Sequence, residues 1–160
     1  MTGNKTMNDF EFFADKEFFK EYLVTGPSES LETYKTLFDF RPNAIKRKEF
    51  NKDRNKLFAD LKKIYGQVCM LNFEICDPTA KLVIDHLIPL TTNKLNKELR
   101  KIKAESGKKV KSQNFGSNHL DNLILACEKC NNNKKHRLLE KEKLRELLER
   151  KRNAKTTTDN

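Results

Sequence analysis

The sequence predicts a small α+β protein in which helices flank two short strands. Residues 82–84 and 122–125 are short apolar stretches with the length expected of strands. Apolar residues recur at helical spacing both before and after these stretches. Four cysteines form two pairs, one before the first strand and one after the second. We therefore expect a shared metal ion to clip the strands to the following helix.

The first 66 residues predict an N-terminal helical segment. Residues 8–40 are rich in phenylalanine, which is typical of core or interface packing, and predict one or two short helices. Gly26-Pro27-Ser28 separates these helices, because neither Gly nor Pro suits a helix interior. After a second break at Arg41-Pro42-Asn43, a longer helix is predicted over 43–65, and Gly66 ends it.

Residues 67–152 hold the predicted strands, the cysteines and a C-terminal basic helix. Leu82-Val83-Ile84 predicts a strand that ends on Asp85-His86, ahead of Pro89. From Glu128 onward the chain predicts a helix with one apolar face, formed by Leu138, Leu139, Leu144, Leu147 and Leu148. Residues 153–160 are polar and predict a flexible tail.

The connection between the two strands, residues 91–118, is long and basic. Between Lys94 and Lys111 it holds eight Lys or Arg against two Glu, a net of +6. Leu95, Leu99 and Ile102 recur at helical spacing and predict a short helix there. Because connections of this length in compact domains are usually functional or disordered, we treat it as a basic insertion with a binding role.

The net charge of +10 is distributed unevenly along the chain. Residues 1–40 hold eight acidic side chains against four lysines, a net of −4, so the remainder carries about +14. A basic surface of this kind suits an anionic partner such as nucleic acid, although the same charge also keeps a protein soluble. The sequence has no bilayer-length apolar stretch and no secretory signal, so we expect a cytoplasmic protein without membrane contact.

The cysteines predict a structural zinc site. Cys127 and Cys130 have the C-x-x-C spacing that lets two thiolates reach one tetrahedral ion, and Cys69 and Cys76 form a looser second pair. A redox dithiol and buried free cysteines are the alternatives, but a thioredoxin-like βαβ context is missing. Four thiolates leave no open position for water, so this zinc is expected to stabilise the fold and not to catalyse.

Two segments together resemble the HNH nuclease family, which is also called the ββα-metal fold. They are LVIDHLIP at 82–89 and NLILACEKCNNNK at 122–134, and the likeness covers about residues 69–137. In that family an Asp-His or His-His pair closes the first strand and Asn-Leu begins the second. A C-x-x-C-(His/Asn)-x-x-Lys sequence then opens the helix. The resemblance implies a metal-dependent endonuclease that hydrolyses DNA and leaves 5′-phosphate and 3′-hydroxyl ends.

The resemblance also implies roles for four residues. His86 would accept a proton from the attacking water, since histidine titrates near neutral pH. Asp85 and Asn131 would hold a catalytic Mg²⁺ or Mn²⁺ through hard oxygen atoms. Asn122 would use its amide to hold the loop that carries His86; the alternative is an ordinary residue at a strand start.

The sequence departs from the family pattern at position 131, where the family often has histidine and this chain has asparagine. An amide oxygen is still a hard, neutral ligand, so Asn131 remains the first candidate. His136 and His119 are rival ligands, depending on where the helix begins and how the preceding loop folds. The asparagine also favours Mg²⁺ or Mn²⁺ over softer metal ions.

Basic residues near the predicted site are candidates for DNA contact. Lys134, Lys135 and Arg137 follow the metal ligand on its helix, and Lys108, Lys109 and Lys111 lie in the basic insertion. Each is explained equally well as a solvated cation. Duplex DNA is the expected partner, a restriction or defence nuclease is the expected subtype, and a homodimer is one assembly this allows. The alternatives are a zinc-stabilised nucleic-acid-binding module that does not cut, a nuclease toxin with an immunity partner, and an RNA nuclease.

Overall fold

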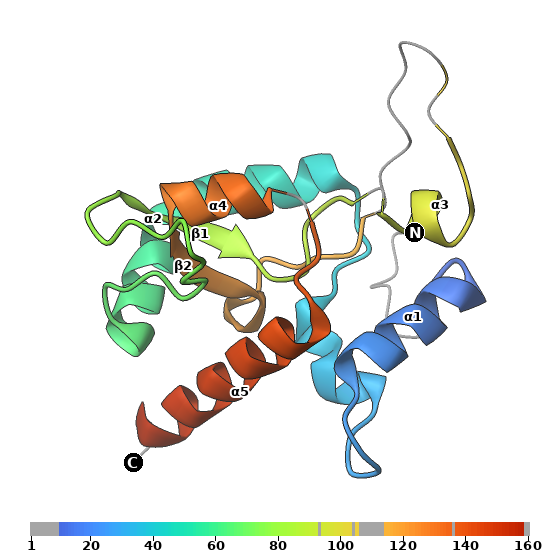
Figure 1. Cartoon of the computed structure of the whole chain (residues 1–160), viewed down its shortest axis with the longest axis horizontal. Coiled ribbons are helices and arrows are strands. Elements are labelled where there is room, and N and C mark those ends of the chain that lie inside the picture. Colours follow the sequence, from blue (N-terminus) through green and yellow to red (C-terminus); the bar gives the residue numbers. More distant parts are fainter. Residues whose placement is uncertain (1–9, 93, 104, 106–113, 136, 159–160) are drawn as a thin grey trace.

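The structure is a computed structural model that describes residues 10–158 except 93, 104, 106–113 and 136. The described residues form an α+β fold, as predicted, with one two-stranded antiparallel sheet among helices (Figure 1). The elements are α1 (Phe13–Leu23), η2 (Leu31–Leu37), α2 (Asn43–Tyr65), β1 (Leu82–His86), α3 (Lys94–Glu98), η3 (Leu120–Asn122), β2 (Leu123–Cys127), α4 (Glu128–Lys134) and α5 (Lys141–Thr158). No helix in these ranges has the length and apolarity needed to cross a bilayer.

The two strands fix where the candidate site residues lie. β1 pairs with β2 so that Leu82 lies opposite Cys127 and His86 opposite Leu123. The Asp-His pair and the end of β2 therefore lie at opposite ends of the small sheet. α4 begins directly after β2 and packs against both strands, which returns the chain toward the Asp-His end (Figure 1).

Two hydrophobic clusters join the N-terminal helices to the strands, and the smaller one packs Leu61 of α2 against Leu123 and Leu125 of β2. All five residues of β2 are buried, because it lies between helices on both faces. The main cluster draws on α1, η2, the loops around β1, β2 and α5, and includes Phe19, Leu37, Leu71, Leu87, Ile124 and Leu144. The boundary expected after residue 66 therefore does not separate two cores.

The C-terminal helix differs from the expectation of one continuous helix after Glu128. α4 ends at Lys134, and Lys135 takes a positive φ of 52° that breaks the helix. Three consecutive asparagines, 131–133, are weak helix formers, and the burial of Leu138 and Leu139 redirects the chain before α5. α5 then extends through Thr158, so residues 153–158, expected as part of a flexible tail, are helical.

The loop that follows β1 is held closely by its neighbours. Gly116 donates its backbone N–H to the oxygen of Pro89 at 3.0 Å. A Cβ atom at Gly116 would lie only 1.9 Å from the backbone oxygen of Ile88, so no larger residue fits there without movement. The buried Lys46 ammonium donates to the backbone oxygens of Asp39 at 2.6 Å and Gly116 at 2.7 Å. α2 is thus tied to the same loop.

Candidate metal centre and catalytic cavity

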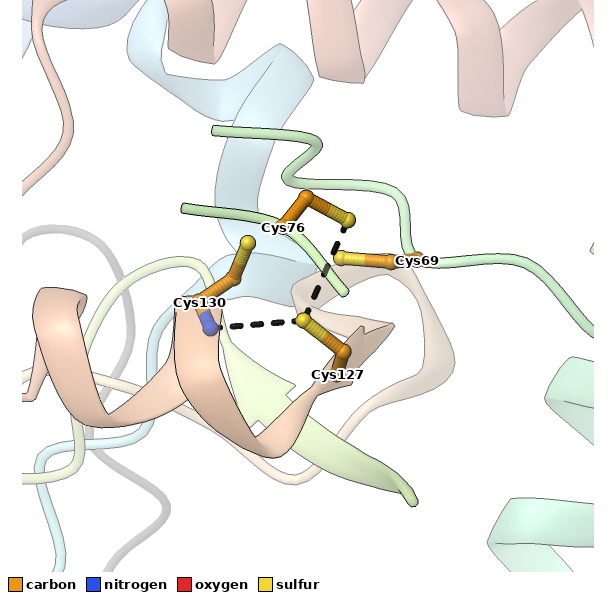
Figure 2. Close-up of side chains that lie close together, drawn as sticks. All are labelled: Cys69, Cys76, Cys127 and Cys130. Atoms are coloured by element: carbon orange, nitrogen blue, oxygen red, sulfur yellow. Dashed lines mark hydrogen bonds between the residues drawn. The ribbon is translucent and has the colours of Figure 1, made fainter. Parts of the chain in front are cut away.

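The four cysteines converge on one point (Figure 2). Cys69 and Cys76 come from the loop between α2 and β1, Cys127 ends β2, and Cys130 lies in α4. The four sulfur atoms lie within 4.8 Å of one another, and none forms a disulfide. A tetrahedral zinc ion with Zn–S bonds of about 2.3 Å places its sulfurs about 3.8 Å apart. The Cys76 and Cys127 sulfurs, 3.9 Å apart, fit that requirement.

Backbone N–H groups point at the sulfur atoms of this cluster. Asn72 donates to the Cys69 sulfur at 3.5 Å. Cys130 donates to the Cys127 sulfur at 3.4 Å, as Figure 2 shows. Burial raises the pKa of Cys127, but backbone N–H donation from Asp77 and Cys130 outweighs it and brings the pKa to about 6. Cys127 therefore favours thiolate, which is the form that binds zinc, whereas burial raises the pKa of Cys76 and Cys130. Convergence of all four cysteines on one point fits a single metal ion better than two dithiols.

A second site lies at the other end of the sheet. A cavity of about 330 Å³ is lined there by residues from β1, the loop after it, α4 and α2. Three residues that the sequence assigned to a catalytic site, Asp85, His86 and Asn131, line it together. Lys135 and Arg47 also line it, so the cavity has cations on its wall.

The buried Lys134 ammonium forms an ion pair with Asp85. The Lys134 ammonium lies 3.1 Å from Oδ2 of Asp85 and donates to the backbone oxygen of His86 at 2.9 Å. Its side chain is only 1% exposed, and that of Asp85 is 8% exposed. The expectation that Lys134 contacts a DNA phosphate is therefore corrected: its ammonium faces the protein interior, held by the carboxylate and the carbonyl.

The surroundings of His86 determine which ring nitrogen carries the proton. The Asn118 amide donates through Nδ2 to the backbone oxygen of Lys46 at 2.8 Å, so its Oδ1 faces Nε2 of His86 at 2.9 Å. An amide oxygen can only accept, and Nε2 must therefore carry hydrogen, which leaves Nδ1 as the acceptor of the ring. The Phe50 ring packs on the imidazole with centroids 5.0 Å apart. Burial lowers the pKa of His86 to about 4 despite the Asn118 hydrogen bond, so the ring is neutral at neutral pH.

Asn122 holds the loop after His86. Its Oδ1 accepts from the backbone N–H of Ile88 at 2.8 Å. Its Nδ2 donates to the backbone oxygens of Ile88 at 2.9 Å and Ser117 at 2.8 Å. The side chain is fully buried, and this one amide satisfies three backbone groups that the loop leaves without partners.

The structure separates the remaining candidates. His119 caps η3, where its Nδ1 accepts from the backbone N–H of Asp121 at 3.0 Å, and it does not line the cavity. Arg137 bonds the end of α4 through the Lys134 oxygen at 3.2 Å and the Asn133 side chain at 3.0 Å. His136, Lys108, Lys109 and Lys111 lie outside the described residues.

Sequence reasoning missed Arg47, Phe50 and Asn118. Arg47 and Phe50 belong to α2, for which the sequence predicts only a helix over 43–65. Asn118 lies 32 residues from its partner His86, and no spacing rule joins them. The alternation of basic residues with Phe50 on α2 was the one signal that could have drawn attention to this helix.

Two residues that line the cavity, Asp85 and Asn131, carry oxygen atoms that could bind a hard divalent cation. Mg²⁺ usually takes one or two protein ligands while keeping several waters. Among the described residues, only the cysteines form a group of three or more convergent metal-binding side chains. A metal ion in the cavity would thus be held by few protein atoms, unlike an ion in the cysteine cluster.

No family model, curated protein or solved structure matches the chain. Its function has to be inferred from the chemistry of the two sites.

Proposed function

We propose that the chain is a metal-dependent endonuclease that hydrolyses DNA phosphodiester bonds in the Asp85–His86 cavity. The observation that carries the proposal is the convergence of Asp85, His86 and Asn131 on one cavity. Phosphodiester hydrolysis needs a base for water, a site for a hard cation and positive charge near the phosphate. These three residues with Arg47 and Lys135 supply all of them.

His86 acts as the base in this proposal. Its ring is neutral, and Asn118 engages Nε2, so Nδ1 holds the lone pair that takes a proton from water. Phe50, which packs against the ring at a tilt, and the Asn118 amide, which accepts from Nε2, keep the imidazole in one orientation. A fixed base lowers the entropic cost of reaching the transition state.

Asp85 and Asn131 would hold Mg²⁺ or Mn²⁺. When bound, such an ion supplies Lewis-acid stabilisation of the charge that develops on the phosphate. Lys134 lies behind Asp85 and limits the cost of keeping a carboxylate at a nearly buried position. Asn122 fixes the loop through which β1 leaves the site, and so sets the direction of His86.

The order strand, strand, helix with an Asp-His pair, Asn122 and Asn131 supports assignment to an HNH-type nuclease of the four-cysteine, zinc-containing kind. The cysteine cluster would hold the structural zinc. Restriction or defence against foreign duplex DNA is the setting we favour, by analogy with HNH proteins that carry added helices and a basic insertion.

Supercoiled plasmid DNA tests this proposal. With Mg²⁺ or Mn²⁺, the zinc-loaded protein should convert supercoiled plasmid to open-circular and linear forms, and without them it should not. The products should carry 5′-phosphates, which a phosphatase and a kinase assay can detect.

The second candidate is a zinc-stabilised DNA-binding module that does not cut. The observation that favours it is the Lys134 ammonium beside Asp85, because this cation already neutralises the carboxylate that a catalytic metal ion would need. Plasmid that stays supercoiled with either metal, while a gel shift shows binding, would select this function over the nuclease.

A further inference from the structure

We propose that Arg47 of α2 binds a phosphate of the DNA strand in the Asp85–His86 cavity. The nucleic-acid surface then extends beyond the strand–strand–helix unit onto α2. This inference rests on the proposed function, in that it names a second element that holds the same substrate. It concerns a residue outside the segments that resemble a known nuclease.

Arg47 is a cation at the cavity wall that forms no ion pair with the protein among the described residues. Lys46 is buried and bonded to two carbonyl oxygens, and Lys134 pairs with Asp85. Arg41 forms ion pairs with Asp39 and Glu49. Arg47 is exposed, lines the cavity, and takes part in none of the ion pairs found among the described residues.

The backbone of Arg47 is fixed relative to His86. In the preceding residue, the Lys46 ammonium donates to the backbone oxygen of Gly116, and the Lys46 backbone oxygen accepts from the Asn118 side chain. One turn further along α2, Phe50 packs on the His86 imidazole. Because a helix holds residues of neighbouring turns in a constant relation, the Arg47 side chain starts from a defined point beside the base.

The chemistry of arginine suits Arg47 to binding an anion in this cavity. A guanidinium stays charged at any working pH, so it can serve neither as a base nor as a metal ligand. Its planar donors match two phosphate oxygens at once. Lys134 offsets the charge of Asp85, so Arg47 and Lys135 give the cavity wall an excess of positive charge that favours an anion.

α2 as a whole has the charge of a DNA-facing element. It holds eight Lys or Arg against three acidic residues, a net of +5 over residues 43–65. Arg54, two turns beyond Arg47, is also exposed, but it lies over the Phe50 ring and donates to Asn51 at 2.8 Å, and it does not line the cavity. It is therefore a matched control that carries the same charge on the same helix.

DNA binding measured without a catalytic metal ion tests the proposal. Fluorescence anisotropy of a short labelled DNA duplex, over a range of salt concentrations and without added Mg²⁺ or Mn²⁺, should show about tenfold weaker binding for Arg47→Gln. The slope of log K against log salt should fall by about 0.9, the value expected when one phosphate contact is lost. Arg47→Lys, which keeps the charge but loses the planar donors, should fall between Arg47→Gln and the wild type.

The control variants decide the outcome. Arg54→Gln should change affinity by much less than Arg47→Gln, and all three variants should unfold at the wild-type temperature because both side chains are exposed. Equal losses for Arg47→Gln and Arg54→Gln, or wild-type binding by Arg47→Gln, would overturn the proposal. The binding experiment measures no cleavage, so it tests only the role of Arg47. A failure of the nuclease proposal would appear in the plasmid experiment, and the two failures can therefore be told apart.

Discussion

At the scale of single residues, His86 owes its chemical state to neighbours that no motif contains. Asn118 accepts from Nε2, Phe50 packs against the ring, and Lys46 fixes the Asn118 amide through its backbone oxygen. The Asp-His pair and Asn131, which line one cavity, could be singled out from sequence because they belong to a short ordered pattern; their catalytic roles stay predictions. Asn118 could not, because only the folded chain brings residues 86 and 118 together.

Removing the Asn118 amide should release the His86 ring. We expect Asn118→Ala to slow plasmid nicking by about tenfold or more, in the range found when a partner that orients a functional histidine is lost. Nitrogen-15 NMR of His86 should show the Nε2–H tautomer in the wild type and a mixture in the variant. Asn55→Ala, an exposed asparagine of α2, is the control and should match the wild type in both readouts. An unchanged tautomer in Asn118→Ala would contradict the positioning role.

Lys134 should stabilise the fold and compete with the metal ion for Asp85. Lys134→Met removes a buried cation 3.1 Å from Asp85 and should lower the free energy of unfolding by about 3–5 kcal/mol. Mg²⁺ should then raise the melting temperature of the variant more than that of the wild type, since the ion replaces the lost charge. Lys129→Met, which removes an exposed partner of Asp77 on the same helix, should cost less than about 1 kcal/mol. Equal Mg²⁺ responses in wild type and Lys134→Met would count against a metal site at Asp85.

At the scale of elements, periodicity and breakers located most helices and strands. The helix 43–65, its end at Gly66 and the strand that ends on Asp85-His86 follow from local patterns, and the structure confirms them. The break between α4 and α5 was not predicted, although residues 131–137 include three weak helix formers and no apolar residue. Tertiary packing contributes to it, since Lys134 turns inward to Asp85 and Leu138 and Leu139 enter the core.

The cysteine cluster should stabilise the junction of β2 with α4. Cys127→Ser removes one of four convergent sulfurs, so the purified variant should hold less than one zinc per chain by mass spectrometry of metals. Loss of a structural metal ion is among the largest single effects on stability, and we expect a loss of more than about 4 kcal/mol. Chelation of zinc from the wild type should produce the same loss. Wild-type protein that is as stable without zinc as with it would refute the structural role.

At the scale of the whole molecule, charged residues of the acidic N-terminal region and of the basic insertion also pair with each other inside the fold. From the sequence, we noted only that residues 1–40 carry a net charge of −4 and the remainder about +14. The structure adds that Asp15 of α1 forms a nearly buried ion pair with Arg100, which lies just after α3 in the basic insertion. The N-terminal helices therefore hold part of the insertion as well as sharing the core, a relation that composition alone does not reveal.

The buried residue Lys151 should make the free energy of unfolding depend on pH. Burial lowers the pKa of Lys151 from 10.5 to about 7, although Asp121 raises it. Its ammonium contacts the Leu120 and Leu123 backbone oxygens and lies 4.4 Å from the Tyr65 ring centre. Between about pH 7 and 10.5 the unfolded chain binds more protons at this residue than the folded chain, so stability should rise with pH across that window.

Chemical denaturation at pH 7 and pH 9 can isolate this contribution. Lys151→Met should reduce the rise in the free energy of unfolding by up to about 1.4 kcal/mol per pH unit, the value for one proton. Lys155→Met, which removes an exposed neighbour on the same helix, should leave most of the rise intact. A Lys151→Met variant with the full wild-type rise would show that Lys151 stays protonated in the folded protein.

The rate of plasmid nicking by His86→Ala, measured beside the wild type at equal zinc content, tests the central claim most directly. With Mg²⁺, the wild type should cut supercoiled DNA. The variant should cut at least about 100-fold more slowly, the usual contribution of a general base. Its zinc content and its affinity for DNA should stay at wild-type values. Cutting by His86→Ala at the wild-type rate would contradict the assignment of the Asp85–His86 cavity as the catalytic site.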